Sequence, residues 1–313
     1  MEYGKVSRRE MMLAATLAIG ALAVGTHARA GSSTPATQPA ANGYGRPSLL
    51  VEPKAPNAIA TGQRVVALTT AKEFAAGHLP GAAQIDWPAL EVTDTSDESI
   101  TQWALATRET LSSLGVGADP VLAYDGGTLF ACRLWWVLFY LGYPEAKLLD
   151  GGLPAWIAAG GQILKNGGTP PSTPVPGSTI SSVPSVTRRN SLATLRDVES
   201  FIGNADVVLV DARAKSEYVA GHIPGAVNLF YPLNAEAASP HRWKPATDLR
   251  TMYAAIGATP EKTIVPYCST GVRSAVTFFT LWLLGYEHVA LYTGSWAEWG
   301  KDPATPKRTG DRP

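Results

Sequence analysis

One cysteine in this sequence has neighbours that favour a reactive thiolate. Cys268 follows the short apolar run 263–267 and precedes a small polar loop, which leads into the apolar stretch 275–284. This order predicts a buried strand, a tight loop and a helix. Backbone N–H groups at the N-terminus of such a helix attract anions, so a cysteine at the loop entrance is expected to have a lowered pKa and a nucleophilic thiolate.

The loop after Cys268 supplies further groups that suit a bound anion. Its residues are Ser269, Thr270, Gly271, Val272 and Arg273. The loop amides and the two hydroxyls can donate hydrogen bonds to a negative sulfur. Arg273 adds a fixed positive charge, which either attracts an oxyanion or braces the loop. Gly271 is expected to adopt a backbone conformation that other residues resist.

The chain contains an internal repeat that defines two domains. Residues 74–82 recur as residues 218–226, at a shift of 144 positions. A period of this length indicates two copies of one domain rather than a solenoid. We place the segments as follows: a first copy at 48–164, a Pro/Gly-rich linker at 165–191, a second copy at 192–301 and a C-terminal tail at 302–313.

Each copy alternates short apolar runs with longer helical patterns. This alternation predicts an α/β fold in which each copy is a mostly parallel sheet flanked by helices. Ligands of such sheets bind at the carboxyl ends of the strands, where Cys268 lies. In the second copy we expect strands at 207–210, 226–229, 263–267 and 289–292, and helices at 215–219, 248–256 and 275–284.

The first copy lacks the groups that define the site in the second. Asp125 stands at the position of Cys268, and residues 67–69 replace Asp-Ala-Arg at 211–213. A carboxylate cannot act as a sulfur nucleophile, but it can cap the helix that follows. The first copy is therefore interpreted as structural, forming one wall of a cleft. The other cysteine, Cys132, lies in an apolar helical stretch and is assigned to packing.

Other residues near the site are assigned mainly to support. Asp211, Arg213 and Glu217 are spaced for an ion-pair and capping network, with substrate binding as the alternative. A catalytic-base role for His222 is disfavoured, because its counterpart His78 occurs in the copy without the cysteine. Trp296 could line the pocket.

These motifs resemble the rhodanese family of sulfurtransferases in its tandem two-domain form. The Gly-His-Ile/Leu-Pro-Gly-Ala box occurs in both copies, and residues 267–273 are similar to the family's active loop. Residues 292–300 are similar to its closing motif, with Thr293 where an acidic residue is more usual. Related phosphatases have one more residue between cysteine and arginine, so the shorter loop here favours sulfur over phosphate.

The resemblance implies a two-step transfer of sulfur through a persulfide on Cys268, without a metal or an organic cofactor. Thiosulfate is the favoured donor, and cyanide or a small thiol the acceptor. A 3-mercaptopyruvate sulfurtransferase is the alternative, although its typical loop, Cys-Gly-Ser-Gly-Val-Thr, differs from residues 268–273. Glu217 falls near the position where vertebrate members carry a substrate-binding arginine. A persulfide carrier that serves one protein partner is a further alternative.

The first thirty residues have the features of an export signal. A basic start at 7–9 precedes the uncharged apolar run 11–24, and residues 28–30 have the small-x-small form of a cleavage site. The basic start resembles a twin-arginine motif, with the general secretory route and an uncleaved anchor as alternatives. We therefore expect a periplasmic or secreted protein, with a flexible lead-in at 31–47 and no stable membrane association after cleavage.

Composition narrows the class of partner. The formal net charge is zero, and 45% of the residues are hydrophobic against 17% charged. Nothing in this balance predicts a nucleic-acid surface or an acidic tail. We expect a monomer whose partners are a small anionic sulfur donor and a thiophilic acceptor.

Overall fold

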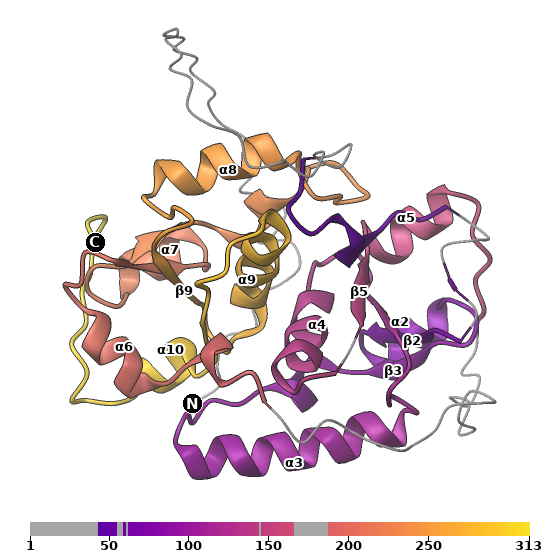
Figure 1. The fold of residues 1–313 in the computed structure, drawn as a ribbon, viewed down its shortest axis with the longest axis horizontal. Helices are drawn as coiled ribbons and strands as arrows, with labels where there is room; N and C mark the ends of the chain where they lie inside the picture. The colour runs from indigo at the N-terminus through magenta and orange to yellow at the C-terminus, as the bar shows by residue number, and fades with distance from the viewer. Residues whose placement is uncertain (1–42, 55–58, 61, 144, 166–186) are drawn as a thin grey trace, which may run out of the picture. The chain divides into compact units, whose positions relative to one another are not determined.

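The computed structural model describes residues 43–54, 59–60, 62–143, 145–165 and 187–313 (Figure 1). In this part of the chain, the first repeat forms a parallel sheet of five strands in the order β1-β5-β4-β2-β3. The central strands are buried at every position, as expected for a parallel sheet covered on both faces. The strands are β1 (Leu50–Val51), β2 (Arg64–Leu68), β3 (Ala83–Ile85), β4 (Val121–Tyr124) and β5 (Ala146–Leu149).

Helices connect these strands and begin at recognisable caps. Thr70 and Glu73 form a capping box at the start of α2, and the Ser96 side chain accepts the Ser99 N–H at the start of α3. The helical segments of the first repeat are η1 (Pro47–Leu49), α2 (Ala71–Ala76), η2 (Trp87–Leu90), α3 (Asp97–Ser113), α4 (Ala131–Tyr140) and α5 (Gly152–Ala158).

The second repeat has the same topology. Its strands pair in parallel as β8-β7-β9 and β10-β6, and a backbone bridge between Ile264 and Val289 joins the two groups. The predicted fold class is confirmed. The elements are η3 (Arg189–Ser191), β6 (Leu192–Ala193), α6 (Leu195–Phe201), β7 (Val207–Asp211), α7 (Lys215–Ala220), β8 (Val227–Asn228), η4 (Tyr231–Asn234), α8 (Ala246–Ala255), β9 (Thr263–Tyr267), α9 (Val272–Leu284), β10 (Leu291–Tyr292) and α10 (Ser295–Trp299).

Several of the predicted boundaries need correction, among them the helix expected at 248–256, which begins two residues earlier as α8 (Ala246–Ala255). The strands expected at 226–229 and 289–292 shorten to two residues each, Val227–Asn228 and Leu291–Tyr292, and Val289 makes only an isolated bridge to Ile264. The helix expected at 275–284 starts three residues earlier, at Val272. Its start lies directly after Gly271, so the polar loop contributes the first turn of the helix.

One hydrophobic core cluster spans both repeats, and each repeat has a smaller cluster of its own. Helices α4 and α9 lie side by side (Figure 1), and their aromatic side chains interlock. The ring centroids of Trp135 and Phe279 are 4.9 Å apart, and those of Phe139 and Trp282 are 4.8 Å apart. A helix that is apolar on nearly all faces requires cover on all faces. Each of these helices covers the other, so the repeats depend on each other for burial.

The lead-in prediction is wrong for its last five residues. Tyr44 is buried, and its hydroxyl donates to the Lys244 carbonyl at 2.7 Å. The Arg46 guanidinium lies 4.0 Å from the centroid of the Trp282 ring. Residues 43–47 therefore pack on the second repeat. The predicted signal at 1–30 and the rest of the lead-in lie outside the described residues.

The linker and the tail also contribute ordered backbone. At the end of the linker, the Arg188 N–H donates to the Tyr140 carbonyl at 2.8 Å, and a short 3-10 turn follows. In the tail, Arg308 pairs with His222 in an antiparallel bridge, as Leu164 pairs with His78 in the first repeat. The backbone pairing of the second repeat thus continues past residue 301.

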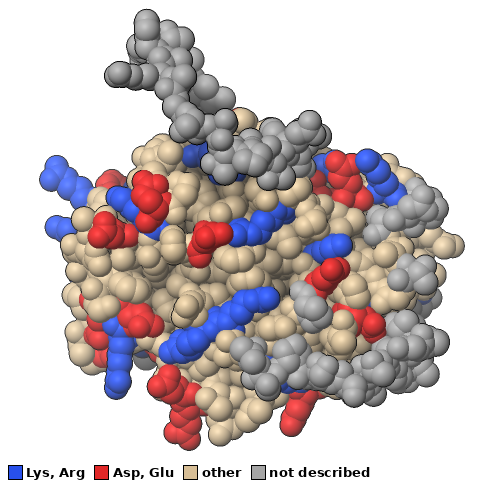
Figure 2. All heavy atoms as spheres, viewed as in Figure 1, with Lys and Arg blue, Asp and Glu red and all other residues tan. Residues whose placement is uncertain are grey.

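Positive and negative side chains are interspersed on the face shown in Figure 2, in keeping with the zero net charge. Within the described ranges, no helix has both the length and the apolar character needed to cross a membrane. The same residues contain no group of three or more His, Cys, Asp or Glu side chains that could hold a metal ion.

Candidate active site

Cys268 lies directly after β9, where the chain turns into α9. Its side chain is buried in a position fixed from both sides. The Cys268 N–H donates to the Ser295 hydroxyl at 3.1 Å, and the Gly271 N–H donates to the Cys268 sulfur at 3.2 Å. The sulfur therefore sits at the positive end of a thirteen-residue helix, where a thiolate is favoured.

The surroundings of Cys268 lower its pKa. Burial alone would raise the pKa of the thiol. The positive charge of Arg273, the hydroxyl and N–H of Ser274, and the Thr270 N–H together outweigh burial, so the net shift is downward. The predicted set of backbone N–H groups around the sulfur, here called the cradle, thus extends one residue beyond the loop, to Ser274.

Gly271 meets the geometric requirement predicted for it. Its φ angle is +86°, in the left-handed region that favours glycine. A Cβ atom at this position would lie 2.8 Å from the Thr293 carbonyl oxygen and 3.1 Å from Nη1 of Arg133. Only glycine keeps the Gly271 N–H aimed at the sulfur without displacing these neighbours.

Arg273 is bound to a carboxylate. Its Nη1 and Nη2 donate to the two oxygens of Glu217 at 2.7 and 2.9 Å. Burial would raise the pKa of Glu217, but the hydrogen bonds and charge of Arg273 lower it. This bidentate pair ties the loop to α7, so the structure shows Arg273 bracing the loop; its role toward a donor oxyanion remains a prediction.

The loop hydroxyls have acceptors other than the sulfur. The Ser269 hydroxyl donates to Glu217 at 3.3 Å, and the Thr270 hydroxyl donates to the Glu91 carboxylate. The expectation that these hydroxyls donate to the sulfur is therefore wrong. Both hydroxyls are held by acids, and a hydrogen bond to the sulfur comes instead from a backbone N–H group, that of Gly271.

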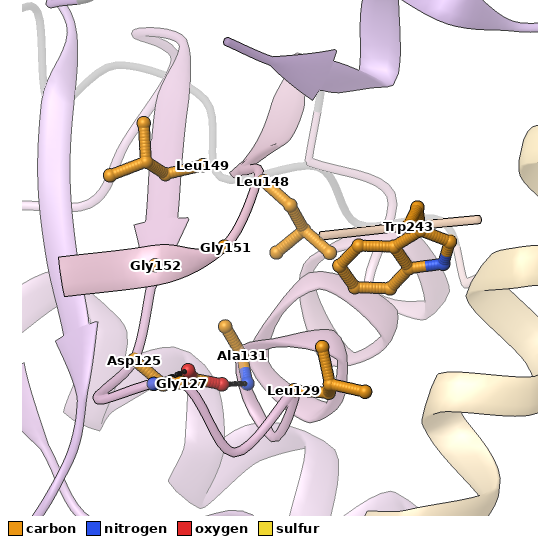
Figure 3. A pocket seen from close by; sticks show the side chains of 9 residues that line it. All are labelled: Asp125, Gly127, Leu129, Ala131, Leu148, Leu149, Gly151, Gly152 and Trp243. Carbon is orange, nitrogen blue, oxygen red and sulfur yellow. Dashed lines mark hydrogen bonds between the residues drawn. The ribbon is translucent and has the colours of Figure 1, made fainter. Parts of the chain in front are cut away.

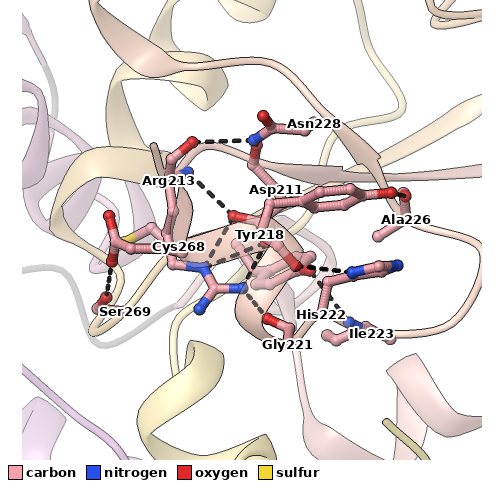
Figure 4. Close-up of polar contacts among 12 residues, drawn as sticks. Asp211, Arg213, Tyr218, Gly221, His222, Ile223, Ala226, Asn228, Cys268 and Ser269 are labelled. Carbon is pink, nitrogen blue, oxygen red and sulfur yellow. Dashed lines mark hydrogen bonds and ion pairs between the residues drawn. The ribbon is translucent and has the colours of Figure 1, made fainter. Parts of the chain in front are cut away.

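The second arginine near the site is structural in this geometry. Arg213 is buried and forms an ion pair with Asp211 at 2.6 Å, and it also donates to the Gly221 carbonyl (Figure 4). Its guanidinium lies 4.6 Å from the centroid of the Trp296 ring. The backbone N–H of Trp296 in turn donates to the Cys268 carbonyl at 3.0 Å. These contacts support the strand end that carries the cysteine.

The histidines are structural as well. His222 is buried, and its two ring nitrogens lie 2.8 Å from the Tyr218 carbonyl and 3.0 Å from the Arg312 carbonyl. In the first repeat, Nδ1 of His78 makes the same contact with Phe74 at 2.9 Å. With both nitrogens occupied by backbone carbonyls, the His222 ring has no position from which to take a substrate proton.

Asp125 occupies the equivalent loop of the first repeat. Its carboxylate accepts the N–H groups of Gly127, Thr128 and Ala131 at 2.7, 3.0 and 2.7 Å. Figure 3 shows the contacts with Gly127 and Ala131. These positions correspond to residues 270, 271 and 274, whose N–H groups surround the Cys268 sulfur. The predicted capping role is confirmed. The same backbone cradle holds a carboxylate in one repeat and a sulfur in the other.

The pocket beside Asp125 is small. Side chains of both repeats line it, and Trp243 of the second repeat forms one wall (Figure 3). Cys132, the residue after Ala131, is completely buried, and burial first and the Asp125 charge second raise its pKa. These features agree with a packing role for Cys132.

Two residues of the first repeat that were not predicted from the sequence reach the site. Glu91 and Arg133 reach the Cys268 loop from that repeat, the first through Thr270 and the second beside Gly271. One signal was present in the sequence: Arg133 is the only charged residue in the apolar helix 131–140. A charge in such a helix is retained only where it has a partner.

The fold and the site together define a class: tandem parallel α/β domains in which one repeat holds a thiolate at a helix N-terminus. The family model for the rhodanese-like domain matches residues 54–159 and 194–302. The chain therefore belongs to the rhodanese family.

Named relatives support this assignment along most of the chain. It is 33% identical to a thiosulfate sulfurtransferase of Pseudomonas aeruginosa, over 82% of this chain and 96% of that protein. It is 38% identical to a probable 3-mercaptopyruvate sulfurtransferase of the same species, over 64% of this chain and 72% of that protein. The crystal structure of YnjE has a TM-score of 0.68 and 25% identity, and the alignment covers 85% of this chain and 69% of that one.

Proposed function

We propose that this protein is a sulfurtransferase that moves sulfane sulfur from thiosulfate to a thiophilic acceptor. The observation that carries the proposal is the Cys268 sulfur, which is surrounded by N–H donors at the start of α9 and has a lowered pKa. The equivalent cradle of the first repeat holds Asp125 and has no nucleophile. The second repeat therefore carries the nucleophile, and the first repeat has a structural role.

The reaction follows from the position of the thiolate. The Cys268 thiolate attacks the outer sulfur of thiosulfate, the sulfur–sulfur bond of the donor breaks, and sulfite leaves with the bonding electron pair. The new persulfide carries its negative charge where the loop N–H groups can hold it. Cyanide then attacks the outer sulfur of the persulfide. Thiocyanate forms, and the thiolate returns.

The donor is proposed from both the loop and the relatives. The chain aligns with nearly the full length of a protein named thiosulfate sulfurtransferase. The higher identity to a probable 3-mercaptopyruvate sulfurtransferase, over a shorter stretch, makes 3-mercaptopyruvate the second candidate donor. The two donors leave the same persulfide on Cys268 and differ only in the leaving group, so a single experiment compares them.

The test is the intact mass of the protein after incubation with each donor. We expect thiosulfate to add about 32 Da, the mass of one sulfur atom, and cyanide to remove it. Cys268→Ala should show no gain, whereas Cys132→Ser should behave as the unaltered protein. A gain with 3-mercaptopyruvate alone would replace the donor. No gain with either donor would contradict the proposed reaction and favour a partner-dependent persulfide carrier.

We also propose that the protein is exported to the periplasm as a monomer. The signal-like features of residues 1–30 support export. The mutual cover of α4 and α9 within one chain supports a monomer. Cell fractionation should yield a shortened periplasmic form, and lysine at both Arg8 and Arg9 should block it if export uses the twin-arginine route. A full-length cytoplasmic protein, or a dimer in sedimentation equilibrium, would contradict these proposals.

A further inference from the structure

Arg133 is a buried cation that crosses the boundary between the repeats. It belongs to α4 of the first repeat and has no exposed surface. Its Nε and Nη2 donate to the Leu90 carbonyl at 3.2 and 2.5 Å, and its Nη1 donates to the Thr293 hydroxyl of the second repeat at 3.0 Å. The guanidinium also lies 4.8 Å from the centroid of the Trp136 ring. All of these partners are uncharged.

A buried guanidinium without an anionic partner is costly. Among the described residues, no carboxylate forms an ion pair with Arg133, whereas Arg213 and Arg273 each have one. Burial lowers the pKa of Arg133 to about 10, and the groups that oppose this effect are Cys268 first and Glu91 second. The anion with the strongest influence on Arg133 is therefore the sulfur of the second repeat.

Contact geometry supports the same pairing. Nη1 of Arg133 lies against Gly271, 3.1 Å from where a Cβ atom of that residue would be. Gly271 is the residue whose N–H donates to the Cys268 sulfur. Thr293, the acceptor of Nη1, precedes α10, whose Ser295 binds the Cys268 N–H. Arg133 thus contacts Gly271 and Thr293, both of which adjoin the Cys268 loop.

We propose that Arg133 is a positioning residue, the buried counter-charge that the first repeat supplies to the thiolate and the persulfide of Cys268. This inference rests on the proposed function. Arg273 is closer in sequence and is the main charge that lowers the pKa of Cys268, and it is ion-paired with Glu217. Arg133 forms no ion pair with a carboxylate in the described part of the chain, and its charge adds to that of Arg273 at the sulfur. The inactive repeat then has an electrostatic role in addition to its packing role.

The other ionisable groups around the sulfur must be included in the test. They lie on several different elements of both repeats. Burial raises the pKa of Glu91, and the Thr270 hydroxyl and Arg133 oppose this effect. Oε1 of Glu91 is buried without a hydrogen-bond partner in the described part of the chain. The groups that interact with Cys268 or its loop are Arg273, Glu217, Glu91 and Tyr231.

The experiment is a pH titration of the ultraviolet absorbance of the thiolate. Each variant is compared with the same variant carrying Cys268→Ser, so that the difference reports Cys268 alone. Arg133→Met and Arg133→Gln remove the charge, and we expect each to raise the inflection by about one pH unit, a tenfold smaller thiolate fraction below the inflection. Arg133→Lys retains a charge and should restore most of the shift.

Three control variants distinguish the effect of the Arg133 charge on the Cys268 pKa from the effect of a less tightly packed structure. Arg64→Met removes another buried arginine of the first repeat that has no carboxylate partner, and it should leave the inflection unchanged. Glu91→Gln removes a negative charge and should lower the inflection or leave it unchanged. Thr293→Val releases Nη1 without removing the charge, and it should raise the inflection by less than Arg133→Met does.

The outcomes decide the proposal. An unchanged inflection in a folded neutral variant overturns it, and so does a lysine variant that shifts as far as the neutral ones. If both neutral variants fail to fold, an unchanged inflection in Thr293→Val overturns it. Because the titration uses no sulfur donor, a failure of sulfur transfer leaves this test intact, and a failure here leaves the persulfide assay intact.

Discussion

Replacing Asp125 by alanine tests whether its carboxylate substitutes for a bound anion in the first repeat. The side chain is 4% exposed, and its two oxygens accept three N–H groups at the start of α4. Alanine would leave all three donors buried. The sequence alone suggested an ordinary helix cap, worth about 1 kcal/mol. The structure predicts a larger effect.

The magnitude follows from counting the donors. A buried polar group without a partner costs about 1–3 kcal/mol, so three N–H groups together cost at least about 3 kcal/mol. Asparagine offers an intermediate case, because its oxygen can replace Oδ1 toward Gly127 and Thr128 while its NH₂ group opposes the Ala131 N–H. The expected order of stability is therefore the unaltered protein, then Asp125→Asn, then Asp125→Ala.

The assay is the free energy of unfolding from urea denaturation, together with Tm. A loss of about 3 kcal/mol corresponds to a fall of about 5 °C for a chain of this size. Asp248→Ala is the matched control, since Asp248 is an exposed acid in the first turn of α8, and it should cost less than about 0.5 kcal/mol. Sulfur transfer measured well below Tm should be retained in all three variants.

Two results would refute this reasoning. A loss below about 1 kcal/mol for Asp125→Ala would mean that the three hydrogen bonds do not hold the cradle. A selective loss of turnover in a stable Asp125→Ala protein would mean that the first loop takes part in chemistry rather than in support.

The remaining predictions concern the active loop and the two cysteines. Gly271→Ala should lower the rate of persulfide formation at least about tenfold and cost about 1–2 kcal/mol of stability, because φ is +86° and the new Cβ would lie 2.8 Å from the Thr293 carbonyl oxygen. Gly126→Ala is the control, because no atom lies within 4 Å of its Cβ position. Equal rates for the two variants would contradict the proposed role of the Gly271 N–H. The rate at which iodoacetamide modifies Cys268 should rise with pH around an inflection below about 8.5, the value for a free thiol, because the pKa of Cys268 is lowered. Cys132, whose pKa is raised, should stay unmodified until the protein unfolds. Peptide mass spectrometry would measure both sites, and modification of Cys132 in the native protein would contradict its raised pKa and its packing role.

The sequence by itself determined the features that depend on local order along the chain. The alternation of apolar runs and helical patterns predicted the parallel α/β repeats, and self-comparison predicted their number. The strand, loop and helix around Cys268 predicted the thiolate, because a helix N-terminus acts on residues adjacent to it in sequence. For the same reason, the capping role of Asp125 was predictable.

Only the tertiary structure decided which charges act on the sulfur. The pairing of Arg273 with Glu217 joins residues on different elements, and the loop hydroxyls turn to acids that the sequence does not place beside them. Arg133 lies more than a hundred residues before Cys268 in the chain, yet the packing of α4 against α9 brings it to Gly271. Electrostatic interactions depend on distance in space and on burial, and both are set only when the two repeats close one core.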